Sequence, residues 1–365
     1  MTTNRGDAER LVGELSRTEK VAMMSGELEF WKGVTALGRH DYYHKHPFPA
    51  GVCDRLGIQG LHFIDGPRGI VLEGGATTYP VSMARGASFN PDLEQQIGDA
   101  IGKELRAMGG NLYGGVCINL LRHPAWGRAQ ETYGEDPMHL GAMGSALTRG
   151  VEQHGMACIK HYALNSMENA RFQIDVSIAP RPLHELYLPH FKDCIDHGAS
   201  VVMSAYNSVN GEWAGQDKVL LTDILRTRWG FEGFVLTDFI MGVRDGHKAI
   251  EAGLDLEMPF PIVWGDKLAK LLDTGAVDEA LVDQALVRMI SPQLILPPAE
   301  DYGTELIGAD AHKALAREAA VQSIVLLKND KAALPLSGNA SLAVLGDLAA
   351  RPNLGDHGSS DGRPD

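Results

Sequence analysis

Polar side chains follow several short apolar runs of this chain, each near the point where the run ends. Asp238 follows the run 234–237, and Phe239 comes directly after it. Lys160 and His161 lie in another such run, and Asp65 follows a third. A carboxylate at the end of a buried strand can act as a nucleophile when its neighbours keep it charged. It can also cap the next helix, and this segment alone leaves both interpretations of Asp238 open.

The other charged positions also admit more than one kind of chemistry. Lys160 can form a Schiff base with a carbonyl substrate or donate hydrogen bonds to hydroxyl groups. Asp65 precedes Gly-Pro, so it is either a turn residue or a carboxylate that accepts hydrogen bonds from two vicinal hydroxyls. Arg128 lies on a loop dense in charge, where a guanidinium would keep nearby carboxylates ionised. Tyr206 fits the core as well as a site, where its hydroxyl would donate to the nucleophile.

Composition excludes several classes of partner. Lys and Arg total 33 against 47 Asp and Glu, a formal net charge of −14, which argues against nucleic acid or an anionic membrane surface. The four cysteines are scattered, and the histidine spacings match no usual ligand pattern, so we expect neither a disulfide framework nor a metal or other cofactor. The chain shows no signal peptide and no apolar run of about 18 residues, which predicts no membrane span and a cytoplasmic location.

The elements that must position these residues alternate between strand and helix. Each apolar run is short and apolar on both faces, as in a buried parallel sheet. We expect strands at 61–64, 87–89, 116–121, 157–162, 200–206, 234–237 and 254–258, and helices at 7–24, 91–105, 137–153, 182–197, 218–229, 242–252 and 264–272. Charged residues at the carboxyl ends of many strands favour an α/β fold of the (β/α)8-like TIM barrel type, possibly incomplete. A doubly wound sheet would show a glycine fingerprint after its first strand, which is missing.

The character of the sequence changes near residue 291. We predict a barrel domain over 1–290 and a proline-containing linker over 291–308. Residues 309–365 then read as the incomplete start of an α/β sandwich domain, with a helix at 309–320 and strands at 323–327 and 340–346. The roughly 65 residues from 301 onward cannot bury a core of their own.

Taken together, these segments resemble glycoside hydrolase family 3, the retaining β-glucosidase and β-xylosidase type. No single motif decides this, but seven occur in the family's order. They begin with Leu61-His-Phe-Ile-Asp-Gly-Pro-Arg-Gly, Pro124-Ala-Trp-Gly-Arg, Tyr133-Gly-Glu-Asp-Pro and Lys160-His-Tyr-Ala-Leu-Asn. They continue with Met203-Ser-Ala-Tyr-Asn, Gly230-Phe-Glu-Gly-Phe-Val-Leu-Thr-Asp-Phe and Ala252-Gly-Leu-Asp-Leu-Glu-Met-Pro.

The resemblance implies a function and a role for each matching position. It implies a retaining, exo-acting β-glycosidase, most closely a β-glucosidase, which acts on a neutral β-glycoside by double displacement with Asp238 as nucleophile. It also implies that Asp65, Arg128, Lys160 and His161 hold the sugar in the first subsite. Tyr206 would lie beside the nucleophile, Met203 would line the pocket, and Arg171 is a weaker candidate on the same wall. Phe239 stands where many relatives carry Trp or Tyr, at the entrance to the aglycone subsite.

The chain departs from the family pattern at two points. The β-glucosidase branch carries its acid/base Glu in the second domain, beyond the part present here, and residues 162–185 lack the Asp-x-His dyad of the N-acetylhexosaminidase branch. The acid/base is therefore unassigned, with Glu168 and Glu131 as weak substitutes. The family's usual Asp before the Pro-x-Trp-Gly-Arg motif is His123, which puts the support of Arg128 in question.

Three functional hypotheses follow. The first is the β-glycosidase, slow on poor leaving groups because it lacks a proton donor. The second is a non-catalytic carbohydrate-binding or assembly subunit, completed by a partner chain or by a second copy of itself. The third is a Schiff-base aldolase that acts through Lys160.

Overall fold

A curled, mostly parallel sheet lies at the centre of the computed structural model, which describes residues 4–38, 42–351, 353–355 and 358–364. Within these residues, six strands pair in the order β1 (Phe48–Ala50), β2 (Leu61–Ile64), β3 (Leu112–Cys117), β4 (Met156–Tyr162), β6 (Val201–Ser204) and β9 (Phe234–Leu236). Every neighbouring pair is parallel except β1 with β2. All residues of β3 and β4 are buried, which explains why these runs are apolar on both faces.

Single bridges carry the pairing from β9 back to β1. They join Leu236 to Leu256, Glu257 to Ser25, and Gly26 to Ala50. The sheet therefore curls into a ring that is complete but thinly paired on this side. The predicted TIM-like barrel is confirmed, with the difference that one strand runs antiparallel.

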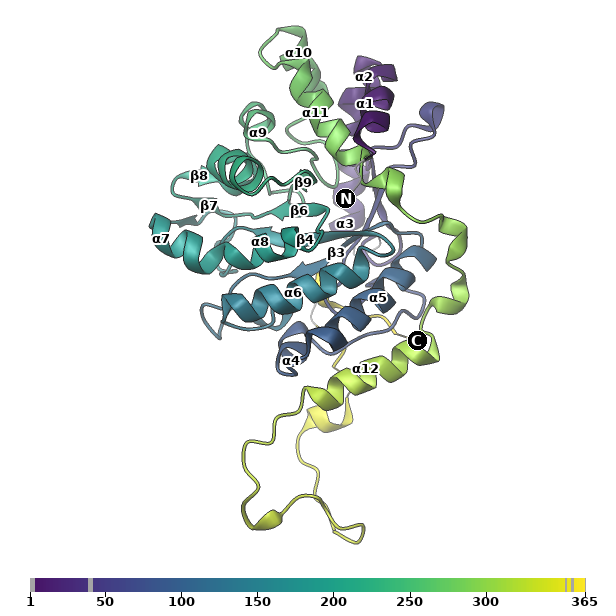
Figure 1. The fold of residues 1–365 in the computed structure, drawn as a ribbon, viewed down its shortest axis with the longest axis vertical. Coiled ribbons are helices and arrows are strands. Elements are labelled where there is room, and N and C mark those ends of the chain that lie inside the picture. Colours follow the sequence, from purple (N-terminus) through teal and green to yellow (C-terminus); the bar gives the residue numbers. More distant parts are fainter. Residues whose placement is uncertain (1–3, 39–41, 352, 356–357, 365) are drawn as a thin grey trace.

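Helices cover the outside of the sheet. α5 (Pro91–Ala107), α6 (Pro137–Val151) and α8 (Pro189–Asp196) lie side by side along β3, β4 and β6 (Figure 1). α1 (Arg5–Glu14), α2 (Arg17–Met23) and α11 (Glu279–Ile290) pack together near β9. The predicted caps form: the Asn90 side chain accepts from Leu93 N, and that of Asp136 accepts from Met138 N and His139 N. The apolar core fills the space between the sheet and these helices.

The remaining elements are short. The helices are α3 (Phe30–Gly38), α4 (Ser82–Gly86), α7 (Pro180–Pro182), α9 (Gly246–Ala252), α10 (Asp266–Asp273) and α12 (Asp310–Gln322). A small second sheet holds β5 (Asp175–Val176), β7 (Ser208–Val209) and β8 (Glu212–Trp213). Helices of π type cover Leu183–Tyr187 and Val219–Arg228.

A buried charge cluster holds the strand that leads to Asp238. The carboxylate of Asp255 is fully buried and accepts a hydrogen bond from Val235 N at 2.7 Å. It also pairs with Arg226 at 2.5 Å and with Arg288 at 2.7 Å. Asp255 therefore fixes β9 to the run 254–258 and to the helices behind them.

Several expected elements differ in the structure. The strand expected at 87–89 is wrong, because Ala87 caps α4, a turn follows, and β2 pairs directly with β3. The strand expected at 254–258 contributes only single bridges. The helix expected at 7–24 is two helices, since Ser16 forms a capping box with Glu19 that begins α2. β1 was not expected at all.

The chain after the barrel forms a linker, the helix α12 and a long segment whose described residues contain only short 3₁₀ turns. The linker contains short 3₁₀ turns, and His312 of α12 pairs with the buried Glu104 of α5 at 2.8 Å. No strand forms at 323–327 or 340–346 in the described structure, and Leu327 and Leu345 are 91% and 88% exposed. An apolar strand needs a neighbour to pair with, and these segments project away from the barrel (Figure 1). The proposed domain bounds stay a prediction.

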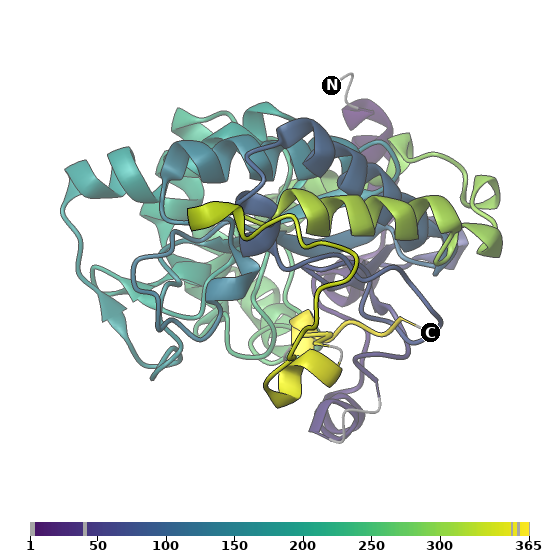
Figure 2. The same ribbon diagram turned by 90° about the horizontal axis from the view of Figure 1, so that it is seen from below.

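The last described residues return to the barrel. Arg68 Nη2 donates to the carbonyl oxygen of Asn353 at 3.2 Å, and His44 lies 3.6 Å from Asp361. Figure 2 shows this end of the chain, in yellow, on the face from which α3 projects.

Candidate active site

One cavity of about 370 Å³ brings all the predicted site residues together. Its lining includes Asp65, Arg128, Lys160, His161, Arg171, Met203, Tyr206, Asp238 and Phe239. These residues come from the carboxyl ends of four strands and from the loops that follow, as in a barrel enzyme. The lining also includes Tyr43, Glu131, Glu168 and Ser359.

Asp238 lines this cavity, and its two carboxylate oxygens differ in their hydrogen bonds. Its Oδ1 accepts a hydrogen bond from Phe239 N at 2.8 Å, whereas Oδ2 is buried with no hydrogen-bond donor among the described residues. His161 Nε2 lies 3.6 Å from Oδ2. Burial raises the pKa of Asp238 to about 6, against the opposing effect of the Arg128 and Lys160 cations. One oxygen is thus held by a hydrogen bond, and the other accepts none from the described residues.

Asp65 and Lys160 form a buried ion pair. Lys160 Nζ donates to Asp65 Oδ1 at 2.7 Å, and Gly66 N donates to the same oxygen at 2.8 Å. Tyr43 donates its hydroxyl to Asp65 Oδ2 at 2.7 Å. Burial alone would lower the pKa of Lys160, but Asp65 outweighs it and the pKa lies above its usual value. A Schiff base requires a neutral amine, so this environment does not support the aldolase hypothesis.

Lys160 and His161 both line the cavity although they are adjacent in β4. In a regular strand their side chains would point to opposite faces. The pairing register between β4 and β6 shifts between Ile159 and Tyr162, which breaks this alternation.

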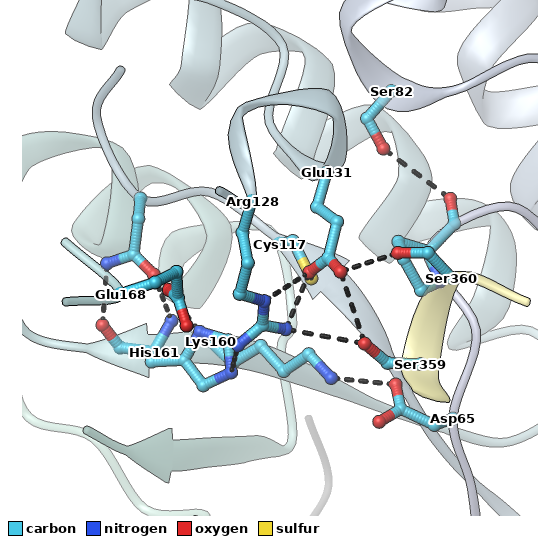
Figure 3. A network of polar contacts seen from close by, with 12 residues as sticks. Asp65, Ser82, Cys117, Arg128, Glu131, Lys160, His161, Glu168, Ser359 and Ser360 are labelled. Atoms are coloured by element: carbon cyan, nitrogen blue, oxygen red, sulfur yellow. Dashed lines mark hydrogen bonds and ion pairs between the residues drawn. The ribbon is translucent and has the colours of Figure 1, made fainter. Parts of the chain in front are cut away.

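Arg128 lies between Glu131 and His161 (Figure 3). Its Nε and Nη2 donate to Glu131 Oε2 at 2.9 and 2.5 Å, and its Nη1 donates to His161 Nε2 at 3.0 Å. Burial, followed by the Arg128 and Lys160 charges, holds the pKa of His161 well below its usual value, so the ring is neutral. Its Nδ1 lies 3.1 Å from Asn119 Oδ1, which accepts the ring proton and fixes the tautomer.

Glu131 is the partner that the sequence left open for Arg128. His123 instead accepts a hydrogen bond from Ala125 N at 3.1 Å. Burial raises the pKa of Glu131, but Arg128 and Lys160 outweigh it and the pKa is lowered. An ionised, ion-paired carboxylate cannot donate a proton, so Glu131 is not a substitute acid/base.

Another part of the cavity lining combines an aromatic ring, Tyr206, with a cation, Arg171. The Arg171 guanidinium lies 4.7 Å from the centre of the Tyr206 ring, and its Nη1 donates to Glu168 Oε2 at 2.7 Å. Tyr206 is near enough to Asp238 to help lower its pKa, but its hydroxyl donates to the Phe239 carbonyl oxygen at 2.9 Å. The expected bond from Tyr206 to the nucleophile is therefore not the one it makes.

The comparison with known proteins is decisive for the family. Residues 51–291 match the N-terminal domain of glycosyl hydrolase family 3. The chain belongs to this family. The resemblance predicted from the motifs is thus confirmed.

Relatives and solved structures of this family match nearly the whole chain. Thermostable β-glucosidase B of Acetivibrio thermocellus is 30% identical over 369 residues, which is 97% of this chain and 46% of that protein. Probable β-glucosidase I of Aspergillus flavus is 34% identical over 355 residues, 94% of this chain and 40% of that protein. β-Glucosidase 3B from Thermotoga neapolitana, solved with α-D-glucose, has a TM-score of 0.89 at 28% identity, over 98% of this chain and 52% of that one. The chain therefore spans about half the length, or less, of these relatives.

Motif reasoning did not find every lining residue of this family 3 chain. Tyr43 lies in an aromatic and histidine-rich loop without a motif, and Ser359 lies 231 residues from Arg128 in the sequence. Only the folded chain shows that these two segments reach the cavity. A motif of serines and glycines such as 358–360 reads as a loop until its partner is known.

The structure also bears on metal and membrane binding. Among the described residues, no group of three or more His, Cys, Asp or Glu side chains is placed to hold a metal ion. No helix in the described ranges is long and apolar enough to span a membrane.

Proposed function

We propose that this chain forms the sugar-binding and nucleophilic part of a retaining, exo-acting β-glycosidase of the β-glucosidase type. The observation that carries the proposal is the Asp238 carboxylate, whose Oδ2 accepts no hydrogen bond from the described residues and which lines one cavity with Asp65, Lys160, Arg128 and His161. These groups offer both donors and acceptors, as a neutral polyhydroxylated ligand requires. The names of the relatives, and the glucose complex of one similar structure, support the same assignment.

In the proposed reaction, Asp238 Oδ2 attacks the anomeric carbon and the bond from that carbon to the leaving-group oxygen breaks. The electron pair of this bond leaves with the oxygen, and a glycosyl ester of Asp238 remains. Water then attacks the same carbon as the bond from that carbon to Asp238 Oδ2 breaks, which releases the sugar and restores the carboxylate, and the proton that the water loses passes to the solvent. Arg128 and Lys160 keep Asp238 charged, while Lys160 donates to sugar hydroxyls and the Asp65 carboxylate accepts from them.

The proton donor for the leaving group is the missing component. In the described part of the chain, the other carboxyl groups that line the cavity are Asp65, Glu131 and Glu168. Each is already engaged by a cation, at 2.7, 2.5 and 2.7 Å respectively. We therefore propose that this chain acts readily only on leaving groups that depart without protonation.

A non-catalytic carbohydrate-binding or assembly subunit is the second candidate. One observation favours it: the cavity has a nucleophile but no free acid among the described residues, while the apolar segments 323–327 and 340–346 stand exposed. In this case a partner chain or a second copy supplies the missing group.

A labelling experiment separates the two candidates. The chain is incubated with a 2-fluoro glucoside that carries an acidic phenol, and the labelled peptide is identified by mass spectrometry. The enzyme proposal expects one sugar on the peptide that holds Asp238, and no label in Asp238→Asn. Glucose binding without label or turnover supports the binding subunit. Turnover that survives Asp238→Asn shows that the nucleophile is another residue.

A further inference from the structure

Glu131 connects the cavity to the far end of the chain. Its Oε1 accepts hydrogen bonds from Ser360 Oγ at 2.5 Å and from Ser359 Oγ at 3.2 Å. Its Oε2 accepts from Arg128 and lies 3.6 Å from Cys117 Sγ. One buried carboxylate therefore serves Arg128 with one oxygen and the segment 358–360 with the other (Figure 3).

The hydrogen bonds from Arg128 to Glu131 fix the orientation of the Arg128 guanidinium in the cavity. A guanidinium carries its five N–H groups in a rigid fork, so holding one edge sets the direction of the rest. Glu131 holds Nε and Nη2, which leaves Nη1 for His161 Nε2. A rotation of the Glu131 carboxylate would thus move both Arg128 and the atom that orients His161.

Ser360 offers a way to perturb Glu131 from outside the cavity. Its side chain is buried, and among the described residues that line the cavity Ser359 is present and Ser360 is not. The loss of the Ser360 hydroxyl therefore removes no contact with a sugar. An effect of this loss on sugar binding therefore passes through Glu131 or through Ser359, whose Oγ also lies 3.5 Å from Arg128 Nη2.

We propose that Glu131 is a positioning residue that couples the docking of segment 358–360 to the sugar-binding geometry of Arg128 and His161. Sugar binding and docking then strengthen each other, because a coupling between two sites acts equally in both directions. The part of the chain beyond residue 309 thereby takes part in sugar binding through a barrel residue. This inference rests on the proposed function, since it assumes that the cavity takes a sugar.

The test measures this coupling from both sides. Glucose binding is followed by calorimetry, and hydrogen exchange of peptides from 353–364 is followed with and without glucose. In the wild-type chain we expect glucose to slow exchange of these peptides. Ser360→Ala should weaken glucose binding about ten-fold, as the loss of a hydrogen bond to a charged group does. Glu131→Gln should remove the effect of glucose on the exchange of 353–364.

Kinetics with an activated aryl β-glucoside provide a second readout. We expect Ser360→Ala to raise KM about ten-fold with kcat within about two-fold, because the loss is one of sugar binding. A merely structural role would instead reduce the active fraction, so that kcat falls and KM is unchanged. Glu212→Gln is the matched control, since Glu212 is a paired carboxylate that does not line the cavity and contacts Lys248 and Gln216 instead.

The outcomes distinguish this proposal from the function on which it rests. Wild-type affinity in Ser360→Ala, or glucose-dependent protection that persists in Glu131→Gln, overturns the coupling. If the wild-type chain neither binds glucose nor turns over the glucoside, the proposed function fails. The coupling is then tested in the absence of sugar by hydrogen exchange. Ser360→Ala must speed the exchange of peptides around Arg128, and an unchanged exchange rate refutes the coupling.

Discussion

Replacing Asp238, the proposed nucleophile, with the neutral Asn should stabilise the fold at neutral pH. Asp238 is buried, and burial raises its pKa from the usual 3.8 to about 6 in the folded chain. The folded state therefore binds the proton more tightly than the unfolded state does. Between pH 3.8 and 6 the free energy of unfolding should fall as pH rises. Above pH 6 Asp238 is ionised in both states, so its contribution to the free energy of unfolding no longer changes with pH.

The magnitude follows from the size of the shift. A rise of about two pH units corresponds to about 3 kcal/mol at pH 7. Asp238→Asn keeps the shape of the side chain but carries no charge, so this cost is absent. We expect the variant to be more stable than the wild type by up to about 3 kcal/mol at pH 7, and equal to it below pH 4, while turnover is lost.

Urea unfolding followed by tryptophan fluorescence can measure this difference at a series of pH values and constant ionic strength. The exposed Asp223 on the segment Val219–Arg228 provides a control, since Asp223→Asn should change stability by less than about 0.5 kcal/mol at any pH. The result decides which effect dominates. If Asp238→Asn is less stable than the wild type at pH 7, the attraction of Arg128 and Lys160 exceeds the cost of burial, and our account of the site is wrong.

Three further predictions concern activity and stability. An aryl β-glucoside with an acidic phenol should turn over far faster than an alkyl β-glucoside, whereas equal rates would show that a proton donor is present. With the aryl substrate, kcat/KM should fall below pH 6 as Asp238 becomes protonated; a profile that is flat to pH 4 would contradict this assignment of the acid limb. Asp255→Ala should destabilise the fold by about 3–5 kcal/mol in urea unfolding, because it leaves Arg226 and Arg288 without their buried partner; a loss under about 1 kcal/mol would show that this cluster does not hold β9.

The buried strands and most of the site could be predicted because their signals are local. Val201–Ser204 and Phe234–Leu236 are buried on both faces, as strands of a parallel sheet covered by helices are. Parallel strands also bring their carboxyl ends together, so residues far apart in sequence had to meet at one face. Asp65 and Lys160 are 95 residues apart and form an ion pair for this reason.

The features that escaped prediction depend on contacts that no local pattern records. β1 has three residues, one of them proline, and is too short to show an alternation. The run 87–89 forms a turn and Phe89 is 74% exposed, so its apolar residues mark neither a strand nor the core. The hydrogen bond between Glu131 and Ser360 joins residues 229 positions apart. No pattern in either sequence segment indicates that the two residues are in contact.

The antiparallel strand β1 ends a segment of the chain that lies outside the ring of strands. The chain leaves the ring at Gly26 and returns at β1, and the two ends are joined by the bridge from Gly26 to Ala50 and by a hydrogen bond from Glu27 N to the Pro49 carbonyl oxygen at 3.0 Å. The described residues between them, 27–38 and 42–47, include α3 and Tyr43 and belong to a segment whose two ends the ring holds. Exchanging this segment would change Tyr43, which lines the cavity and donates to Asp65, and would also remove the contacts of His44 with Val71 and Glu73. The rim of the cavity and the packing beneath it are therefore joined through this one segment.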